Sequence, residues 1–306
     1  MNAVLPATAP QASNRSGSGV RFTYTPEQLR GFAQQVLDLA RRAGASACEC
    51  EVSEGNGLSV TVRMGAVETI EHNRDKGIGV TVYVGERPAA RRGHASTSDL
   101  SPVALEQTVA AAMAIASRTA VDDCAGPPEA AELAREPRDL DLFHPWVLGT
   151  EEAIALAKRV EGAAFALSAK IRNSEGAMVS AQHGQFVLAN SLGFMQGYPT
   201  SRHMLSLSVI AEEKGLMQRD DWYSSARVPG GLADPEALGR YAGERALARL
   251  RSRKIPTCQA PVLLEAPVAA GLIGSFVSAA SGGNLYRKSS FLLDALGRRV
   301  FPAGVS

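Results

Sequence analysis

Hydrophobic residues near the start of the chain recur at helical spacing. Apolar positions run from Leu29 to Ala40 with the three- and four-residue steps of an amphipathic helix. Thr25 can accept a hydrogen bond from the free N–H groups of the first turn, and Pro26 suits that turn because it needs no N–H partner there. Gly44 provides a stop. The sequence therefore predicts a helix between Thr25 and Gly44.

The spacing then changes to strict alternation of apolar and polar residues between Cys48 and Val84. Alternation of this kind is typical of strands with one buried face. Turn-forming residues interrupt it at Gly55-Asn56-Gly57, Met64-Gly65 and Gly85-Glu86. We therefore expect an antiparallel meander of short strands.

The same order of elements follows a second time. Ser101-Pro102 opens a helix that runs to about Arg118, and another helix is expected from about Thr150 to Ala169. Strand-like pieces come next, between residues 177 and 212, and Asp234-Pro235 opens a helix that reaches about Arg251. The order helix, meander, helix thus occurs twice, as in a degenerate internal repeat, although few residues are identical between the copies.

The C-terminal segment has a different pattern. A short apolar stretch at residues 261–265 predicts a strand, and small residues from Pro267 to about Ala280 predict a helix. Ser281-Gly282-Gly283-Asn284 is expected to end this helix, with glycine supplying a positive φ. The alternative, a loop that holds phosphate, lacks the Gly-Lys-Ser/Thr sequence opening a helix.

These elements predict an α+β fold, with helices packed on antiparallel β-meanders and followed by the start of a β-rich C-terminal domain. A chain of 306 residues is long enough for more than one domain. We expect a disordered leader at 1–20, an N-terminal α+β domain at 21–120, a Pro-rich linker at 121–140, a central α+β domain at 141–254, and a truncated C-terminal domain at 255–306.

Composition narrows the classes of function. The chain has 32 Lys and Arg against 31 Asp and Glu, a net charge of +1, which argues against nucleic acid as a partner. No stretch approaches the roughly 20 apolar residues of a membrane helix, so no membrane association is expected.

The leader lacks the pattern of a signal peptide, which favours the cytoplasm. Cys48 and Cys50 share one strand face and are expected to be free thiols.

Several short segments follow one another in a distinctive order and spacing. They are Val67–Glu71 with Arg74–Val80, Ala95–Leu100, Asp141–Pro145, Asn190–Phe194, and Val268–Gly274 with Ser281–Leu292. Together they extend over nearly the whole chain after the leader. In this order and spacing they resemble the TldD/PmbA metallopeptidase family, and the PmbA (TldE) type in particular.

This resemblance implies a cytoplasmic peptidase built from two different subunits. A TldD-type subunit is expected to hold zinc or a similar divalent ion, and the PmbA-type subunit to complete a cleft for extended or unfolded peptides. Family members are about half again as long as this chain, so most of the C-terminal domain is expected to be missing. Any apolar face that meets that domain would then be exposed.

The metal motif of the TldD-type subunit is absent here. That subunit resembles other metallopeptidases in placing His-Glu-x-x-x-His on the helix after a strand, where two His side chains and a Glu share one face. The corresponding segment, Pro267–Phe276, has no His, Glu, Asp or Cys to coordinate a cation. We therefore predict no catalytic residue, no metal ligand and no cofactor in this chain.

Five residues remain as candidates for contact with a peptide or a partner subunit. Two cations beside an aromatic ring could bind nucleic acid, a peptide carboxylate or a subunit, and a solvated turn is an equally strong interpretation. The family resemblance favours a subunit interface or a peptide cleft. Asp220-Asp221 could bind a cation, but a loop packed by Trp222 is favoured because two ligands are too few. The five candidates are Ser281, Asn284, Tyr286, Arg287 and Lys288.

Three other functions compete with the accessory-subunit prediction. The chain could be a peptidase by itself, with a site that no motif reveals, although neither Ser275 nor Cys258 has the neighbours that a nucleophile requires. It could be a gyrase modulator linked to nucleic acid, against which the neutral charge balance argues. It could also be a gene fragment without function.

Overall fold

The computed structural model describes residues 20–86, 89–134, 136 and 138–304. The leader predicted at residues 1–20 lies outside this range except for Val20. The chain forms two compact units, one that ends at Ser252 and one from Arg253 onward. None of the helices that the described residues form is long and apolar enough to cross a bilayer.

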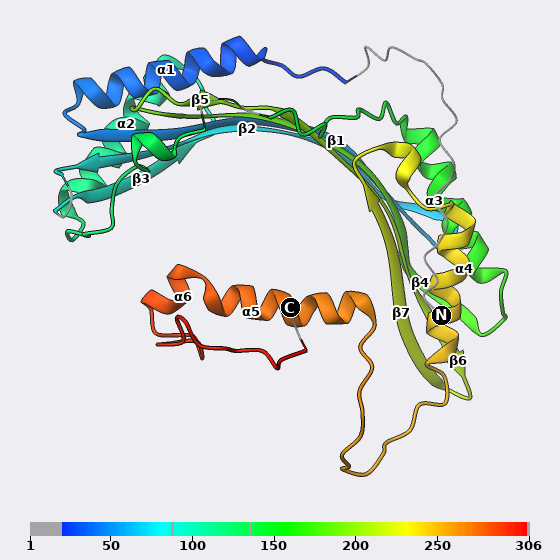
Figure 1. Cartoon of the computed structure of the whole chain (residues 1–306). Coiled ribbons are helices and arrows are strands. Elements are labelled where there is room, and N and C mark those ends of the chain that lie inside the picture. Colours follow the sequence, from blue (N-terminus) through cyan, green and yellow to red (C-terminus); the bar gives the residue numbers. More distant parts are fainter. Residues whose placement is uncertain (1–19, 87–88, 135, 137, 305–306) are drawn as a thin grey trace. The chain divides into compact units, whose positions relative to one another are not determined.

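One antiparallel sheet organises the first unit (Figure 1). Its strand order is β3-β2-β1-β4-β6-β7, and the short β5 pairs with β4. The predicted regions 21–120 and 141–254 thus contribute to the same sheet. The strands are β1 (Ala47–Arg63), β2 (Ala66–Val84), β3 (Arg91–Thr97), β4 (Ile171–Asn190), β5 (Met195–Gln196), β6 (Pro199–Glu213) and β7 (Leu216–Ala226).

The two halves of the sheet meet at β1 and β4, which pair antiparallel from Glu49 opposite Asn190 to Val62 opposite Ala177. Gly55 lies opposite Gly184 near the centre of this pairing. A helix, a meander and a second helix lie on each side of it, so the repeated order of elements is confirmed. The α+β class is confirmed as well.

Four helices cover one face of this sheet: α1 (Pro26–Arg42), α2 (Pro102–Arg118), α3 (Thr150–Phe165) and α4 (Pro235–Ala248). Thr25, Ser101 and Asp234 each cap their helix through the side-chain oxygen, with Pro in the first turn. The two short 3-10 helices are η1 (Ala130–Glu132) and η2 (Pro229–Gly231). Local capping chemistry thus fixes where three of the four helices begin.

The hydrophobic core consists of two main clusters on this helical face. Buried side chains of β1 come from even-numbered residues, such as Val52 and Val60, so both clusters lie on the same side of the strand. One cluster joins α1 and α2 to β1 and β2, and the other joins α3 and α4 to β1, β4 and β6. Figure 1 shows α1 and the α3–α4 pair at opposite ends of the outer side of the curved sheet.

The prediction of a turn at Gly55-Asn56-Gly57 is wrong, because β1 runs through it without a break. Each of these residues has a partner in β2 and another in β4. A Cβ atom at Gly55 or Gly57 would collide with the side chain of Asp75 or Gln182. Glycine here makes room for neighbouring side chains rather than for a turn.

Two predictions for the C-terminal segment are also wrong. Residues 261–265 form no strand, and Leu263 is 98% exposed. The helix ends at Ala280 with Ser281 as its C-cap, as predicted, but Gly282 and Gly283 do not have the predicted positive φ. They begin the short helix α6 (Gly282–Tyr286) instead. The small-residue helix itself is confirmed as α5 (Ala266–Ala280).

A buried carboxylate fixes the hairpin between β1 and β2. Met64 and Gly65 have φ values of 52° and 74°, which the tight turn of a hairpin requires. Glu161 of α3 is 2% exposed and accepts both of their N–H groups, at 2.9 and 2.7 Å. The turn was predicted from the sequence, but its partner on α3 was not.

We expect Glu161→Ala to lower the free energy of unfolding by about 1–3 kcal/mol, because two N–H donors lose a charged acceptor. Glu152→Ala on the exposed side of the same helix is the control, with an expected effect within about 0.5 kcal/mol. Urea unfolding followed by circular dichroism measures both. Equal losses in the two variants would contradict the role of Glu161.

Candidate functional site

Helix α5 covers the segment in which the sequence resemblance leads us to expect the counterpart of the TldD-type metal motif. Its 15 residues contain no His, Cys, Asp or Glu. Ser275, one of its two hydroxyl residues, donates to the carbonyl of Gly271 within the same helix at 3.0 Å. The helix therefore presents no side chain suited to a divalent cation.

Asn284 organises the turn after α5. Its Nδ2 donates to the carbonyl of Ser278 at 2.7 Å, and its Oδ1 accepts a hydrogen bond from Arg287 at 3.0 Å. Its own carbonyl accepts the hydroxyl of Ser289 at 3.3 Å. The carbonyl of Ser281 accepts the N–H groups that begin α6. These contacts make Ser281 and Asn284 structural residues of the turn.

The other three candidates are more accessible. Tyr286 is 89% exposed, and Arg287 is exposed although it contacts Asn284. Lys288 has a φ of 56°, a left-handed conformation that is uncommon for a residue other than glycine. The structure thus presents one aromatic ring and two cations together on the surface of the second unit.

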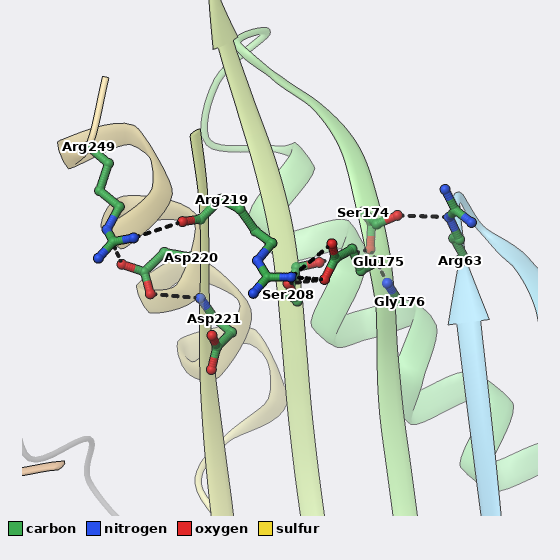
Figure 2. Close-up of polar contacts among 9 residues, drawn as sticks. All are labelled: Arg63, Ser174, Glu175, Gly176, Ser208, Arg219, Asp220, Asp221 and Arg249. Carbon is green, nitrogen blue, oxygen red and sulfur yellow. Dashed lines mark hydrogen bonds and ion pairs between the residues drawn. The ribbon is translucent and has the colours of Figure 1, made fainter. Parts of the chain in front are cut away.

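The paired carboxylates at Asp220-Asp221 do not form a cation site. They lie on strand β7 rather than in the predicted loop, so their side chains point to opposite faces. Asp220 is held by Arg249 at 3.0 Å and Arg245 at 3.3 Å. Figure 2 shows the ion pair between Arg249 and Asp220 beside a second one, in which Arg219 binds the carboxylate of Glu175.

The cysteine thiols of β1 do not favour nucleophilic chemistry. Cys48 and Cys50 are both 2% exposed on the helical face, as their spacing predicts. Burial raises the pKa of Cys48 to about 12, and it raises the pKa of Cys50 as well. Both thiols are therefore protonated at neutral pH and poor nucleophiles.

Between the two hydrophobic clusters, the helical face of the sheet carries a strip of buried polar side chains that sequence analysis missed. No helix among the described residues covers this polar strip; extended chain at residues 20–25 and 141–148 does. The members come from β1, β4 and β6, far apart in sequence, and each is at most 7% exposed. They are Glu54, His183, Gln185, Ser201 and His203.

Glu54 binds the first of these extended segments. Its carboxylate accepts the N–H groups of Thr23 and Tyr24 at 2.5 and 3.1 Å, and Gln185 donates to the carbonyl of Tyr24 at 2.7 Å. Burial by itself raises the pKa of Glu54, but hydrogen bonds from Thr23, Tyr24 and Gln185 outweigh it, so the pKa is lowered overall. Glu54 is therefore an ionised anchor for the chain that leads into α1.

Two histidines bind the second extended segment in their neutral forms. The Nε2 atom of His183 accepts the N–H of Trp146 at 3.1 Å, and Nε2 of His203 lies 2.9 Å from the carbonyl of His144, to which it donates. Burial, and then the neighbouring His203, lower the pKa of His183 to about 4; burial also lowers the pKa of His203. These two side chains are therefore positioned to hold backbone and not to transfer protons near pH 7.

Family models match three successive parts of the chain. Residues 48–116 match PmbA/TldA metallopeptidase domain 1, residues 143–250 match the central domain, and residues 257–306 match the C-terminal domain. The chain belongs to the PmbA/TldD metallopeptidase family.

Curated relatives are of the PmbA type. The chain is 45% identical over 274 residues to metalloprotease PmbA of Escherichia coli O157:H7, covering 90% of this chain and 60% of that protein. It is 39% identical over 276 residues to the PmbA homologue of Haemophilus influenzae, with the same coverage. The chain therefore spans about 60% of the length of the curated relatives it matches.

Solved structures share the fold. A proposed modulator of DNA gyrase from Bacteroides thetaiotaomicron superposes with a TM-score of 0.80 at 20% identity, over 90% of this chain and 62% of that one. TldE from Thermococcus kodakarensis superposes with a TM-score of 0.58 at 13% identity, over 86% of this chain and 58% of that one.

We expect Asn284→Ala to loosen the turn after α5, because it removes the contacts with Ser278 and Arg287. Amide hydrogen exchange in residues 281–290 should become at least about tenfold faster, as local opening there costs less free energy. Tyr286→Ala is the control, since that ring is exposed and should leave exchange unchanged. Unchanged exchange in Asn284→Ala would show that the side chain does not organise the turn.

Proposed function

We propose that this chain is a non-catalytic, PmbA/TldE-like subunit of a cytoplasmic, heteromeric metallopeptidase that cleaves extended or unfolded peptides. A TldD-type subunit is its proposed partner and supplies zinc or a similar divalent ion. Such an ion, when bound, polarises the scissile carbonyl and lowers the pKa of a bound water molecule. The chain's own contribution would be to shape the cleft and to bind the partner.

The composition of α5 carries this proposal. In a helix that would have to hold two His and a Glu, all 15 positions are occupied by apolar residues, glycine, proline or serine. The residues present therefore do not fit a catalytic metal, and no step of the reaction is assigned to them. Among the described residues, one cluster has ligand atoms close enough together to bind a metal ion: Asp122, Asp123 and Cys124. All three residues are exposed, and the Asp122 carboxylate already accepts the N–H of Cys124.

The sheet suits a role in guiding an extended peptide. Residues 66–76 of β2 pair with β1 on one side, while β3 pairs with β2 only from Ile78 onward. Among the described residues, no strand pairs with the other edge of this stretch, so a peptide could add there as a further strand. This stretch of β2 carries exposed charged residues, such as Glu71 and Arg74. Charged side chains of this kind are typical of strand edges that avoid pairing with the edges of other molecules.

The proposal predicts that the purified chain alone does not cleave unfolded casein peptides. Addition of a TldD-type protein with the His-Glu-x-x-x-His motif should produce cleavage, and a chelator should abolish it. Cleavage by this chain without a partner would overturn the proposal and favour a peptidase with an unrecognised site. Salt-dependent DNA binding would instead favour a gyrase-linked role.

The exposed cations after α5 are the proposed contacts with the partner or the peptide. We expect Arg287→Glu with Lys288→Glu to weaken co-purification with the TldD-type protein by about tenfold or more, because two favourable contacts become repulsive. Arg298→Glu with Arg299→Glu is the matched control, since these cations are exposed in the same unit. The role of Arg287 and Lys288 is excluded if both complex formation and proteolysis stay unchanged.

A further inference from the structure

An open cavity of about 790 Å³ lies beside the extended segments that cover the polar strip. Three strands of the sheet and both extended segments line it. The strands contribute the middle of β1, residues 72–74 of β2, and Ala181 and His183 of β4, and the extended segments contribute Val20-Arg21 and Trp146–Leu148. Its volume is in the range of small-molecule sites, roughly 300–1,000 Å³. Because extended chain rather than a helix covers this part of the sheet, a cavity is left between the two helix pairs.

The charge of this cavity has one sign. Arg21 and Arg74 both line it, whereas no Asp or Glu occurs among its described lining residues. Within the described residues, neither guanidinium group is part of an ion pair. The nearest acidic residues of β2, Glu71 and Asp75, point to the opposite face of the sheet because successive strand residues alternate. Glu54 on the helical face lines an adjoining cavity together with Arg21 and Arg74, but its carboxylate accepts the N–H groups of Thr23 and Tyr24. No described carboxylate therefore forms an ion pair with the two guanidinium groups.

The rest of the lining can fix the orientation of an anion. Because the Nε2 atom of His183 accepts the N–H of Trp146, the neutral ring carries its proton on Nδ1 and keeps one donor. Trp146, Leu148 and Leu58 provide apolar surface, and Asn56 provides an amide. Arginine guanidinium groups bind planar oxygen anions with two parallel hydrogen bonds.

We propose that this cavity binds a small molecule that carries a carboxylate or phosphate group on an apolar or aromatic body. The anionic group lies between Arg21 and Arg74, and the apolar body packs against Trp146 and Leu148. This site is on the helical face and lies outside α5 and the turn after it. It does not depend on peptidase function, so the chain binds the anion whether or not it binds a partner.

The chain has two tryptophans, so a single substitution makes binding at this cavity visible. In the full chain with Trp222→Phe, Trp146 is the only indole, and its fluorescence reports on the cavity. We expect phenyl phosphate or phenylacetate to change this fluorescence in a saturable way, and neutral benzyl alcohol to leave it unchanged. The tighter of the two anions identifies which oxygen group the site prefers. Calorimetric titration of the unsubstituted chain checks that Trp222→Phe has not created the response.

Charge-removing substitutions test the geometry. Arg74→Gln and Arg21→Gln should each weaken binding of the preferred anion by about tenfold or more, because each removes a guanidinium group that can donate two charge-assisted hydrogen bonds to the anion. Arg42→Gln is the control, since Arg42 is exposed in the same unit but does not line the cavity. The proposal is wrong if neither anion gives a saturable change at millimolar concentration, if benzyl alcohol binds equally well, or if Arg74→Gln binds like Arg42→Gln.

Discussion

The pairing of β1 with β4 is the interaction on which the first unit depends. Each half of this unit contains a helix, a meander of strands and a second helix, and neither half closes its own sheet. The β1–β4 ladder joins the two meanders into one sheet and removes two long unpaired edges. It also fixes the register, because a shift by one residue would turn every buried side chain of β1 to the opposite face.

The polar strip follows from this arrangement. Each half places its own helices over its own part of the sheet, so the centre, where the halves meet, has no helix among the described residues. Buried polar groups need hydrogen-bond partners, and here the partners are backbone groups of extended chain. Glu54 and Gln185 hold the segment before α1, while His183 and His203 hold the segment before α3. The same centre is where the cationic cavity lies.

The sequence predicts the elements that depend on local chemistry. Thr25, Ser101 and Asp234 begin helices where capping rules place them, and Met64-Gly65 forms the expected hairpin turn. Prediction failed at Gly55-Asn56-Gly57 because pairing on both sides outweighs the local preference of glycine for turns. For the candidate site, the lack of ligands on α5 can be read directly from its residues. The contact between Glu54 and Gln185 spans 131 residues, and no local pattern reveals it.

A strand with partners on both sides has an evolutionary consequence. Adding or deleting one amino acid within β1 would misalign it with β2 and β4 at once, and would place apolar side chains in water beyond that point. Length variation among descendants should therefore accumulate elsewhere, as in the stretch between α2 and α3, which has little regular structure in the residues described. The centre of the sheet can drift in the identity of its side chains, but hardly in the number of its residues.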